Sequence, residues 1–326
     1  MKLFRKMKSG YRSIIHTMDK LNIDKSSRFS VFWDIVYCKI RFRCSYQEYV
    51  NYNLHRYKNR HRKHFLFMKT RFKLYKKING VERGGLHKSQ QRQIIKTGIS
   101  RDMILIPDAG EEKFLEFVRK YGKTVVKPDY GSCGFAVSLF VYENDEQALQ
   151  FYRSLTAPAV CEEFICQHKE MASLHAASVN TIRVLALRDG ENVNFISATL
   201  KLGGSATSIA DNMVNGGMGA AVDIQTGIVK TFGYDLKNNP YTHHPISGKQ
   251  IIGFQIPNWD ILLKTIASAH KMIPGFPLLG WDVAVTENGV EIVEINSASG
   301  TRILQIMDQQ PKGKYLTDYI KKHKHS

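Results

Sequence analysis

The sequence is poor in the residues that build disulfide-linked or membrane-spanning folds. It holds five cysteines, an odd number without a CxxC pair, which argues against a disulfide framework or a structural zinc site. No apolar run reaches the roughly 18 residues of a spanning helix. The N-terminus is basic but lacks the apolar core and cleavage site of a secretory signal. With nine prolines and 24 glycines among 326 residues, the chain is not of low complexity, and we expect a globular cytoplasmic protein.

Acidic residues are scarce at the start of the chain. Residues 1–80 hold 21 Lys and Arg but only four acids, a net charge of +17 out of a total of +18. This asymmetry predicts a basic region over 1–80, a second domain over 81–315 and a basic tail over 316–326. The basic region should seek anionic lipid head groups, an anionic polymer or a nucleic acid. Nucleic acid is the least favoured partner, because no recognised binding module accompanies the charge.

The basic region is predicted to be mainly helical. Within Ser30–Arg43, Phe32, Ile35, Val36 and Ile40 recur at helical spacing. Such a helix either docks on a membrane surface or covers a protein core, and the sequence leaves both interpretations open.

After a linker at Ile78–Gly84 and helices at His87–Gly98 and Glu111–Tyr121, the pattern becomes mainly β. The chain as a whole is therefore predicted to be of the α+β class. Helices are also predicted at Asp145–Ser154 and Asn258–Met272. The predicted strands are Thr124–Pro128, Phe135–Glu143, Ala159–Gln167, Ser178–Arg188, Asn192–Lys201, Ala220–Asp223, Ile228–Phe232, Leu279–Thr286 and Val290–Asn296.

A short glycine-containing loop joins the first two predicted strands. Lys127 precedes it, and Ser132, Cys133 and Gly134 lie within it. Backbone N–H groups of such a loop can cradle phosphate oxygens, with the lysine reaching the same phosphates. The loop is not a Walker A motif, because GxxxxGK[ST] is absent and a strand follows. A plain hairpin turn is the alternative interpretation.

An acidic pair opens the next predicted strand. Glu162 and Glu163 precede Phe164 and Ile165, and Glu170 follows a few residues later. Such carboxylates can accept hydrogen bonds from an adenine amino group and from ribose hydroxyls. Solvated carboxylates are the alternative.

Two cations lie on the following strands. Arg183 is surrounded by β-branched and apolar residues, so it requires an anionic partner. Lys201 ends the next strand, and Asp211 and Asn212 precede the glycine-rich turn Gly216–Gly219. The combination favours a phosphate or carboxylate site, while a structural ion pair is the alternative.

The last predicted hairpin carries three oxygen-bearing side chains. If Glu287–Gly289 is a three-residue loop with a left-handed glycine, Thr286 pairs with Val290. Counting back along both strands places Asp282 opposite Glu294, with Asn296 on the same face. Two carboxylates buried together require a cation, and oxygen ligands suit Mg²⁺ shared with nucleotide phosphates. A two-residue loop would turn Asp282 to the other face, and an exposed acidic hairpin is the alternative.

Taken in order, these motifs resemble the ATP-grasp superfamily, and among its branches the sugar-transfer-associated one. The resemblance covers most of the chain, and its matching parts are Asp34, Tyr46–Tyr52, Val126–Gly134, Glu162–His168, Ser178–Val184, Asp211–Gly217, His244-Pro245, Gly253-Phe254, Pro257, Trp259 and Gly280–Asn296. It implies a fold in which two α+β subdomains clasp ATP.

The resemblance also implies roles for single residues. Lys127 and the loop residues Ser132, Cys133 and Gly134 would bind the ATP phosphates, with Lys88 as a second phosphate-binding lysine. Glu162, Glu163, Phe164 and Ile165 would line the adenine pocket, Glu170 would take the ribose, and Asn212 would contact the nucleotide. Asp282, Glu294 and Asn296 would hold Mg²⁺. Related ligases often carry an arginine two residues before the metal aspartate. Gly280 occupies that position here, so Arg183 and Lys201 are the expected catalytic cations.

The expected activity is an ATP- and Mg²⁺-dependent ligation of a carboxylate to an amine or hydroxyl through an acyl phosphate. By family analogy, the acceptor would be sugar-linked and used for cell-surface polysaccharide, with the basic region at the inner face of the membrane. Two rivals remain. One is an ATP-dependent phosphotransferase acting on a sugar or alcohol, and the other is a non-catalytic ATP-binding scaffold at the membrane.

Overall fold

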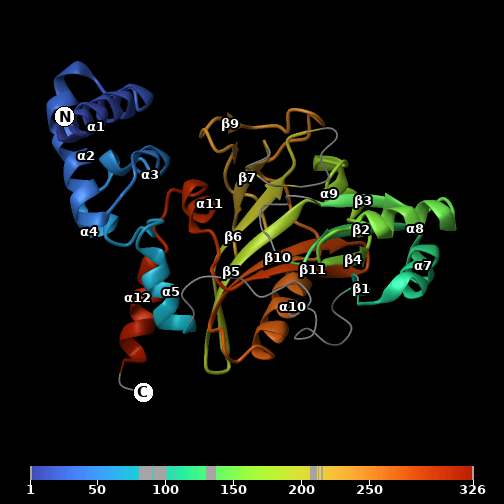
Figure 1. Ribbon diagram of the computed structural model, residues 1–326. Helices are drawn as coiled ribbons and strands as arrows, with labels where there is room; N and C mark the ends of the chain where they lie inside the picture. Colours follow the sequence, from blue (N-terminus) through green and yellow to red (C-terminus); the bar gives the residue numbers. More distant parts are fainter. Residues whose placement is uncertain are drawn as a thin grey trace. The chain divides into compact units, whose positions relative to one another are not determined.

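The polypeptide forms two units of opposite charge. The computed structural model describes residues 2–80, 91, 101–106, 108–129, 137–205, 211, 213 and 216–324. Unit 1 combines Met1–Arg83 with Gly300–Ser326, and unit 2 is Gly84–Ser299 (Figure 1). Unit 1 holds 28 Lys and Arg against seven Asp and Glu, a net charge of +21, whereas unit 2 has a net charge of −3.

Unit 1 is helical in its described part. Ser45 begins the third helix with a capping box, in which its side chain and that of Glu48 each accept from the other residue's backbone N–H. None of the described helices combines the length and apolar character needed to cross a bilayer. The helices are α1 (Lys2–Lys20), α2 (Arg28–Phe42), α3 (Tyr46–Asn51), α4 (Asn59–Arg62), α5 (Arg71–Asn79), α11 (Thr301–Ile306) and α12 (Gly313–Lys322), with 3-10 turns at Lys25–Ser27 and Leu54–Arg56.

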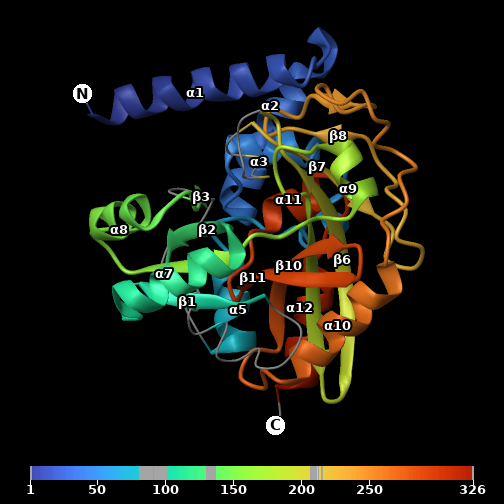
Figure 2. The same cartoon turned by 90° about the vertical axis from the view of Figure 1, so that its right-hand side faces the viewer.

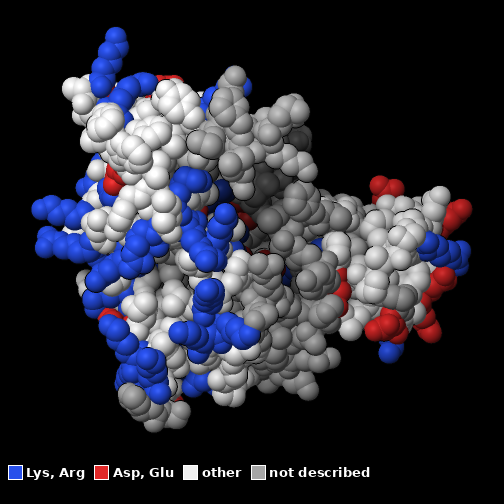
Figure 3. Space-filling view, turned by 60° about the vertical axis from the view of Figure 1, so that its left-hand side comes forward, with Lys and Arg blue, Asp and Glu red and all other residues white. Residues whose placement is uncertain are grey.

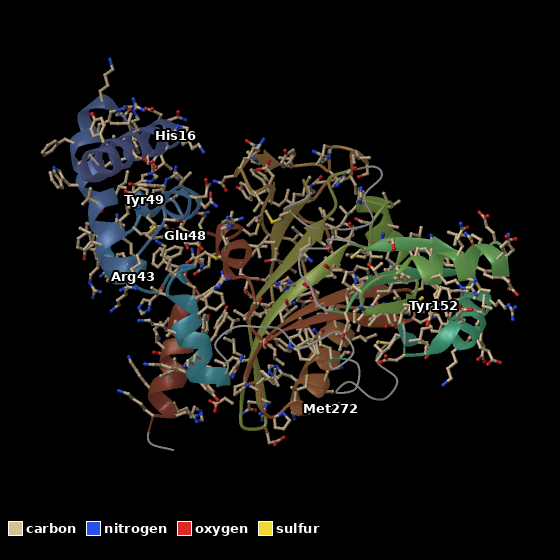
Figure 4. The ribbon with its side chains drawn as sticks, viewed as in Figure 1. His16, Arg43, Glu48, Tyr49, Tyr152 and Met272 are labelled. Atoms are coloured by element: carbon tan, nitrogen blue, oxygen red, sulfur yellow. The ribbon has the colours of Figure 1, made fainter. Side chains whose placement is uncertain are left out.

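An ion pair between a buried arginine and a half-buried aspartate ties the helices of unit 1 together. Arg62 in α4 donates both terminal guanidinium nitrogens to the carboxylate of Asp34 in α2. Tyr49 in α3, labelled in Figure 4, donates its hydroxyl to the same carboxylate at 2.5 Å. Arg62 also donates to the carbonyl of Leu54 at 2.9 Å. Among the described residues, the donors to Asp34 thus come from unit 1.

Unit 2 begins with a four-stranded antiparallel sheet in the order β1-β4-β2-β3. Its strands are β1 (Met103–Ile106), β2 (Lys123–Pro128), β3 (Ser138–Val141) and β4 (Ala159–Glu163). Helices α7 (Gly110–Tyr121) and α8 (Asp145–Ser154) lie on this sheet (Figure 2). Phe114, Val118, Phe140 and Ala148 form the apolar core between sheet and helices.

A second sheet of seven strands, in the order β11-β10-β5-β6-β7-β8-β9, makes up the rest of unit 2. One face packs on α10 through Val184, Leu200, Trp281 and Ile266. Because side chains alternate along a strand, the residues between these apolar ones project from the opposite face. The elements are α9 (Lys169–Leu174), β5 (Thr181–Asp189), β6 (Asn192–Leu202), β7 (Met218–Val222), β8 (Gly233–Tyr234), β9 (Pro240–Tyr241), α10 (Trp259–Lys271), β10 (Leu278–Thr286) and β11 (Gly289–Asn296).

Several predicted strands differ in extent from the observed ones. The strand predicted over Ala159–Gln167 ends at Glu163, and the chain beyond it crosses to the larger sheet, where Gln167 makes an isolated bridge to Thr286. Ile228–Phe232 is not a continuous strand, because Val229 makes only a single bridge. Strand β1 was not predicted at all.

Candidate functional site

A two-residue turn joins β10 and β11, so the three-residue loop predicted over Glu287–Gly289 is wrong. Thr286 pairs with Gly289 rather than with Val290. The φ angle of Gly289 is 152°, far from the left-handed value near 60° that the predicted loop requires.

A β-bulge on β11 restores the register. The pairing shifts between Asp282 and Val283, and Val293 is left without a partner across the strand pair. Beyond the shift, Asp282 pairs with Glu294, and Asn296 lies two residues further on the same face. The predicted opposition of Asp282 and Glu294 is therefore confirmed, through a bulge instead of a longer turn.

The polar face of the larger sheet carries a buried network of charges beside this pair. Arg183 on β5 donates to both carboxylate oxygens of Asp282, each at 2.5 Å. The Nζ of Lys201 on β6 lies 3.1 Å from an oxygen of Asp211 and 3.6 Å from one of Asp282. The backbone N–H of Thr181 donates to Asp211 at 3.0 Å. Three neighbouring strands thus bring Arg183, Lys201 and Asp282 together.

Burial and neighbouring charges act in opposite directions on the pKa values of this network. Burial acts to raise the pKa of Asp282, but Arg183 and Lys201 outweigh it and hold that pKa below its usual value. Burial acts to lower the pKa of Arg183 and of Lys201, yet the surrounding carboxylates raise both. Each of these groups therefore stays charged at neutral pH. The charge of Glu294 also acts on Arg183.

The position two residues before Asp282 has no room for a side chain. A Cβ on Gly280 would lie 2.3 Å from Oγ and 2.6 Å from Cβ of Ser299, and 3.6 Å from Cδ of Arg183. Arg183 itself donates to Oγ of Ser299 at 3.3 Å. Ser299 therefore occupies the space that a side chain at position 280 would need.

A second buried cluster lies where the two sheets of unit 2 meet. Lys127 on β2 places Nζ 2.8 Å from the carboxylate of Glu162, which Arg101 also contacts. Arg101 in turn donates to the carbonyl of Ile292 on β11 at 3.2 Å. Burial lowers the pKa of Lys127, more than Glu162 and the nearby Glu294 raise it. Glu294 thus lies within electrostatic reach of both clusters.

The other residues predicted to bind the nucleotide are less closely grouped than those of the two clusters. Lys123 places its ammonium 3.7 Å from the ring centroid of Phe164, Ile165 is buried and Glu163 is half-buried. Glu170 is exposed and lies 3.8 Å from Lys249. Lys88, Ser132, Cys133, Gly134 and Asn212 lie outside the described residues.

Two residues that lie in these clusters were not among the predicted ones. Arg101 was missed because strand β1, which begins two residues after it, was missed. The signal available was the apolar run Met103–Ile106 followed by Pro107. Asp211 was noted beside Asn212 but given no role, and only the fold brings it to Lys201.

The donor set of Asp282, Glu294 and Asn296 fits a magnesium ion. Each carboxylate oxygen has two lone pairs, so Asp282 can accept from Arg183 and still coordinate a cation. Nδ2 of Asn296 is buried and, among the described residues, has no hydrogen-bond partner. Rotation of that amide about its last torsion presents the oxygen instead. Carboxylate and amide oxygens are the ligands that Mg²⁺ prefers.

An ATP-grasp-type protein is defined by the features described above: two antiparallel sheets, a buried lysine cluster and an acidic hairpin. The chain belongs to the sugar-transfer associated ATP-grasp family, whose model matches residues 51–317. This membership confirms the predicted α+β ATP-grasp fold. No curated protein is significantly similar to it in sequence.

Solved structures of similar fold are distant in sequence. The ATP-grasp ligase PsnB, complexed with a minimal precursor, Mg and ADP, is 14% identical, with a TM-score of 0.45 over 74% of this chain and 59% of that one. D-Alanine-D-alanine ligase from Helicobacter pylori is 14% identical, with a TM-score of 0.43 over 73% of this chain and 60% of that one. The chain thus spans less than two thirds of these relatives.

Proposed function

We propose that the protein is an ATP- and Mg²⁺-dependent ligase that joins a carboxylate to an amine or hydroxyl through an acyl phosphate. The observation that carries this proposal is the charge network on the polar face of the larger sheet. Three carboxylates, those of Asp211, Asp282 and Glu294, face two cations, Arg183 and Lys201. Carboxylate oxygens held beside fixed cations on one face suit Mg²⁺ shared with the phosphates of a nucleotide.

In this proposal Asp282, Glu294 and Asn296 hold Mg²⁺, which when bound neutralises charge on the nucleotide phosphates. A substrate carboxylate oxygen attacks the γ-phosphorus, the bond to the β,γ-bridging oxygen breaks, and ADP leaves. The amine or hydroxyl then attacks the acyl carbon, phosphate leaves with the bonding electron pair, and the attacking group loses its proton. Arg183 and Lys201 orient the substrate carboxylate and stabilise negative charge on the transferring group.

The nucleotide would bind at the cluster around Glu162. We propose that Lys127 binds its phosphates together with Lys88 and the loop residues Ser132, Cys133 and Gly134. Binding would require Lys127 to exchange its contact with Glu162 for a phosphate, and the low pKa that burial gives this lysine would rise on meeting the anion. Glu163, Phe164 and Ile165 would complete the adenine pocket with Glu162. Glu170 would take the ribose, and Asn212 would contact the phosphates.

The test is a screen of ATP turnover by the full chain against panels of carboxylic acids and amines. We expect ADP release to depend on a carboxylate and the product to contain a new amide or ester by mass. Glu294→Gln should lower turnover by about 10²-fold or more, because it removes an anionic ligand and keeps the shape.

The matched control is Glu191→Gln in the turn between β5 and β6, whose side chain is 90% exposed, and it should turn over ATP as the parent does. A phosphorylated product without an amide or ester would replace the ligase proposal with the phosphotransferase. Unchanged ATP affinity and activity in Asp282→Asn with Glu294→Gln would overturn the metal site.

We further propose that the acceptor is sugar-linked and serves cell-surface polysaccharide assembly at the inner, cytoplasmic face of an anionic membrane. The support is the family description and the net charge of +21 on unit 1. A region of this charge concentrates near anionic lipid within a Debye length of about 8–10 Å. The basic region 1–80 would then bring the ligase to a membrane-bound acceptor.

A further inference from the structure

Helix α2 in unit 1 has two apolar faces, and only one of them is buried. Ile35 and Cys38 face the core of unit 1 and are fully buried. On the other side, Phe29 is 78% exposed, Trp33 56%, Tyr37 40% and Ile40 77%. At about 100° per residue these four side chains lie within an arc of about 80°, opposite Cys38. We call them the aromatic stripe.

The aromatic stripe is continuous with further rings at its edges. The ring centroids of Trp33 and Phe32 lie 5.5 Å apart, and those of Phe32 and Tyr11 in α1 lie 6.0 Å apart. Tyr37 contacts Phe42 at 6.0 Å between centroids. Phe29 and Ile40 are the two most exposed of the large hydrophobic side chains in the described part of the chain. A contiguous exposed patch of this kind marks an interaction surface.

Exposed basic side chains precede and follow the stripe along the chain. Lys25, Arg41 and Arg43 are exposed, and Arg43 follows the last turn of α2 (Figure 4). Figure 3 brings unit 1 forward and shows Lys and Arg gathered over it with few Asp or Glu among them.

The acids near the stripe offset little of this charge. Asp19 is paired with Arg28 at 2.5 Å, and Asp34 is paired with Arg62. Asp24 is exposed at the start of the turn that precedes α2. A mixed apolar and cationic surface therefore remains along the helix.

We propose that α2 lies in the plane of an anionic lipid bilayer with the aromatic stripe inserted into its interfacial layer. Phe29 and Ile40 supply apolar area, while Trp33 and Tyr37 have the amphipathic rings that favour the head-group level. The exposed basic residues Lys25, Arg41 and Arg43 bind anionic head groups. This inference specifies which part of the chain would make the membrane association in the proposed function. It rests on the proposed function only for the location of the acceptor.

The stripe fits a lipid surface better than the other candidate occupants. A second copy of unit 1 would bring another net charge of +21 against it, which repels. A nucleic acid is bound by cations and stacked rings, whereas Phe29 and Ile40 project furthest and give a polyanion no hydrogen bond.

The position of Trp33 provides a direct probe of insertion. The chain has three tryptophans, and the other two, Trp259 and Trp281, are buried in unit 2. The full chain is mixed with vesicles of phosphatidylcholine alone or with phosphatidylglycerol. With the anionic vesicles we expect a blue shift of the emission and its quenching by brominated lipid, both lost in Trp33→Phe.

Binding is measured by vesicle flotation of variants that fold as the parent does. Phe29→Ser with Ile40→Ser should weaken partition to anionic vesicles about tenfold or more, because each change removes a large apolar side chain from the bilayer. Ile261→Ser is the matched control, since Ile261 is 46% exposed on α10 of unit 2, and it should bind as the parent does. Arg41→Glu with Arg43→Glu should weaken binding and reduce its salt dependence.

The stripe variant should keep full ATP turnover in solution, so failure of this inference is distinguishable from failure of the ligase proposal. Unchanged partition of the stripe variant, or unquenched emission from Trp33 in bound protein, overturns the insertion. A parent that is dimeric by sedimentation and made monomeric by the stripe changes, with no loss of lipid binding, replaces the bilayer by a second copy. Binding to RNA that the stripe changes abolish while lipid binding persists also overturns it.

Discussion

Two pairs of aspartate and arginine, one in each unit, have the same chemistry and different surroundings. In unit 1, Asp34 receives two nitrogens of Arg62 and the hydroxyl of Tyr49. In unit 2, Asp282 receives two nitrogens of Arg183, and Lys201 lies 3.6 Å away. Both pairs are bidentate, the geometry in which arginine binds a carboxylate most strongly.

The neighbours decide what each pair can do. Around Asp34, one carboxylate faces one guanidinium, and the other partners are neutral hydroxyl and carbonyl groups, so the charge is balanced. Around Asp282, the neighbours are themselves charged: Lys201 lies 3.6 Å away, and Glu294 pairs with Asp282 across the strands. A single ion pair among neutral groups stabilises a fold, whereas a buried network of several charges is typical of a site for a cation or a charged substrate.

Removing each arginine is the strongest way to break this comparison. Arg183→Met should lower ATP turnover by about 10²–10³-fold, because it removes a fixed cation beside the reacting groups. Arg62→Met should lower the free energy of unfolding by about 3 kcal/mol, because Asp34 loses its counter-charge, and should preserve turnover per folded molecule. Steady-state kinetics and urea unfolding measure the two effects.

Lysine variants serve as controls for charge without geometry. Arg183→Lys and Arg62→Lys keep a cation but lose the second parallel N–H, so each should show a smaller loss than its methionine variant. If Arg62→Met reduced turnover per folded molecule as much as Arg183→Met does, the two pairs would not differ in role.

The sequence predicted the chemical nature of the partner of Arg183 better than it predicted the backbone of the hairpin that carries this partner. An arginine among β-branched residues requires an anion, and the anion is Asp282. The opposition of Asp282 and Glu294 was predicted from a loop that does not exist. A bulge at Val293 restores the alternation that the shorter turn would have reversed, and no residue type in β11 marks that bulge.

Other features depend on contacts between distant segments. Gln305 in α11 accepts from the backbone of Leu66 at 2.9 Å, so the C-terminal helices complete a unit that begins at the N-terminus. Helical periodicity grouped Ile40 with Ile35, yet the first is exposed and the second buried. A helix with apolar residues on two sides does not reveal which side the protein covers.

Gly280 allows the unit 2 pair to be disturbed without changing a charge. Gly280→Ala places a methyl group against Ser299 and should lower the free energy of unfolding by up to about 3 kcal/mol. Turnover should fall as well, because Ser299 and Arg183 would both shift. Urea unfolding and steady-state kinetics report the two changes.

A double-mutant cycle locates the cause. Ser299→Gly in the same chain should restore most of the lost stability, as a direct contact requires. Gly275→Ala is the control, since nothing lies within 4 Å of a Cβ there. Equal losses in the Gly275 and Gly280 variants would show that the contact with Ser299 does not matter.

The smallest expected effect is a difference between the two units in how far acid pH lowers their stability. His270 lies behind Asp282 on the apolar face of the larger sheet, with its ring centroid 5.6 Å from that of Trp281. Its Nε2 donates to the carbonyl of Phe276 at 3.0 Å, and burial lowers its pKa to about 4. Between about pH 6.5 and 4 the unfolded chain binds a proton that the folded chain does not, so stability falls as the pH falls.

From pH 7 to pH 5 this single group should lower the stability of unit 2 by about 2 kcal/mol. Hydrogen exchange of peptides from β10, corrected for intrinsic rates, should accelerate accordingly, and more than exchange of peptides from α3 in unit 1. His270→Gln keeps an N–H donor for Phe276 but does not titrate, so it should reduce the pH dependence in β10. Burial also lowers the pKa of His175 and His244 in unit 2, so a smaller dependence should remain. If the pH dependence of β10 were the same with and without His270, the acid sensitivity of the sheet beneath Asp282 would have another source.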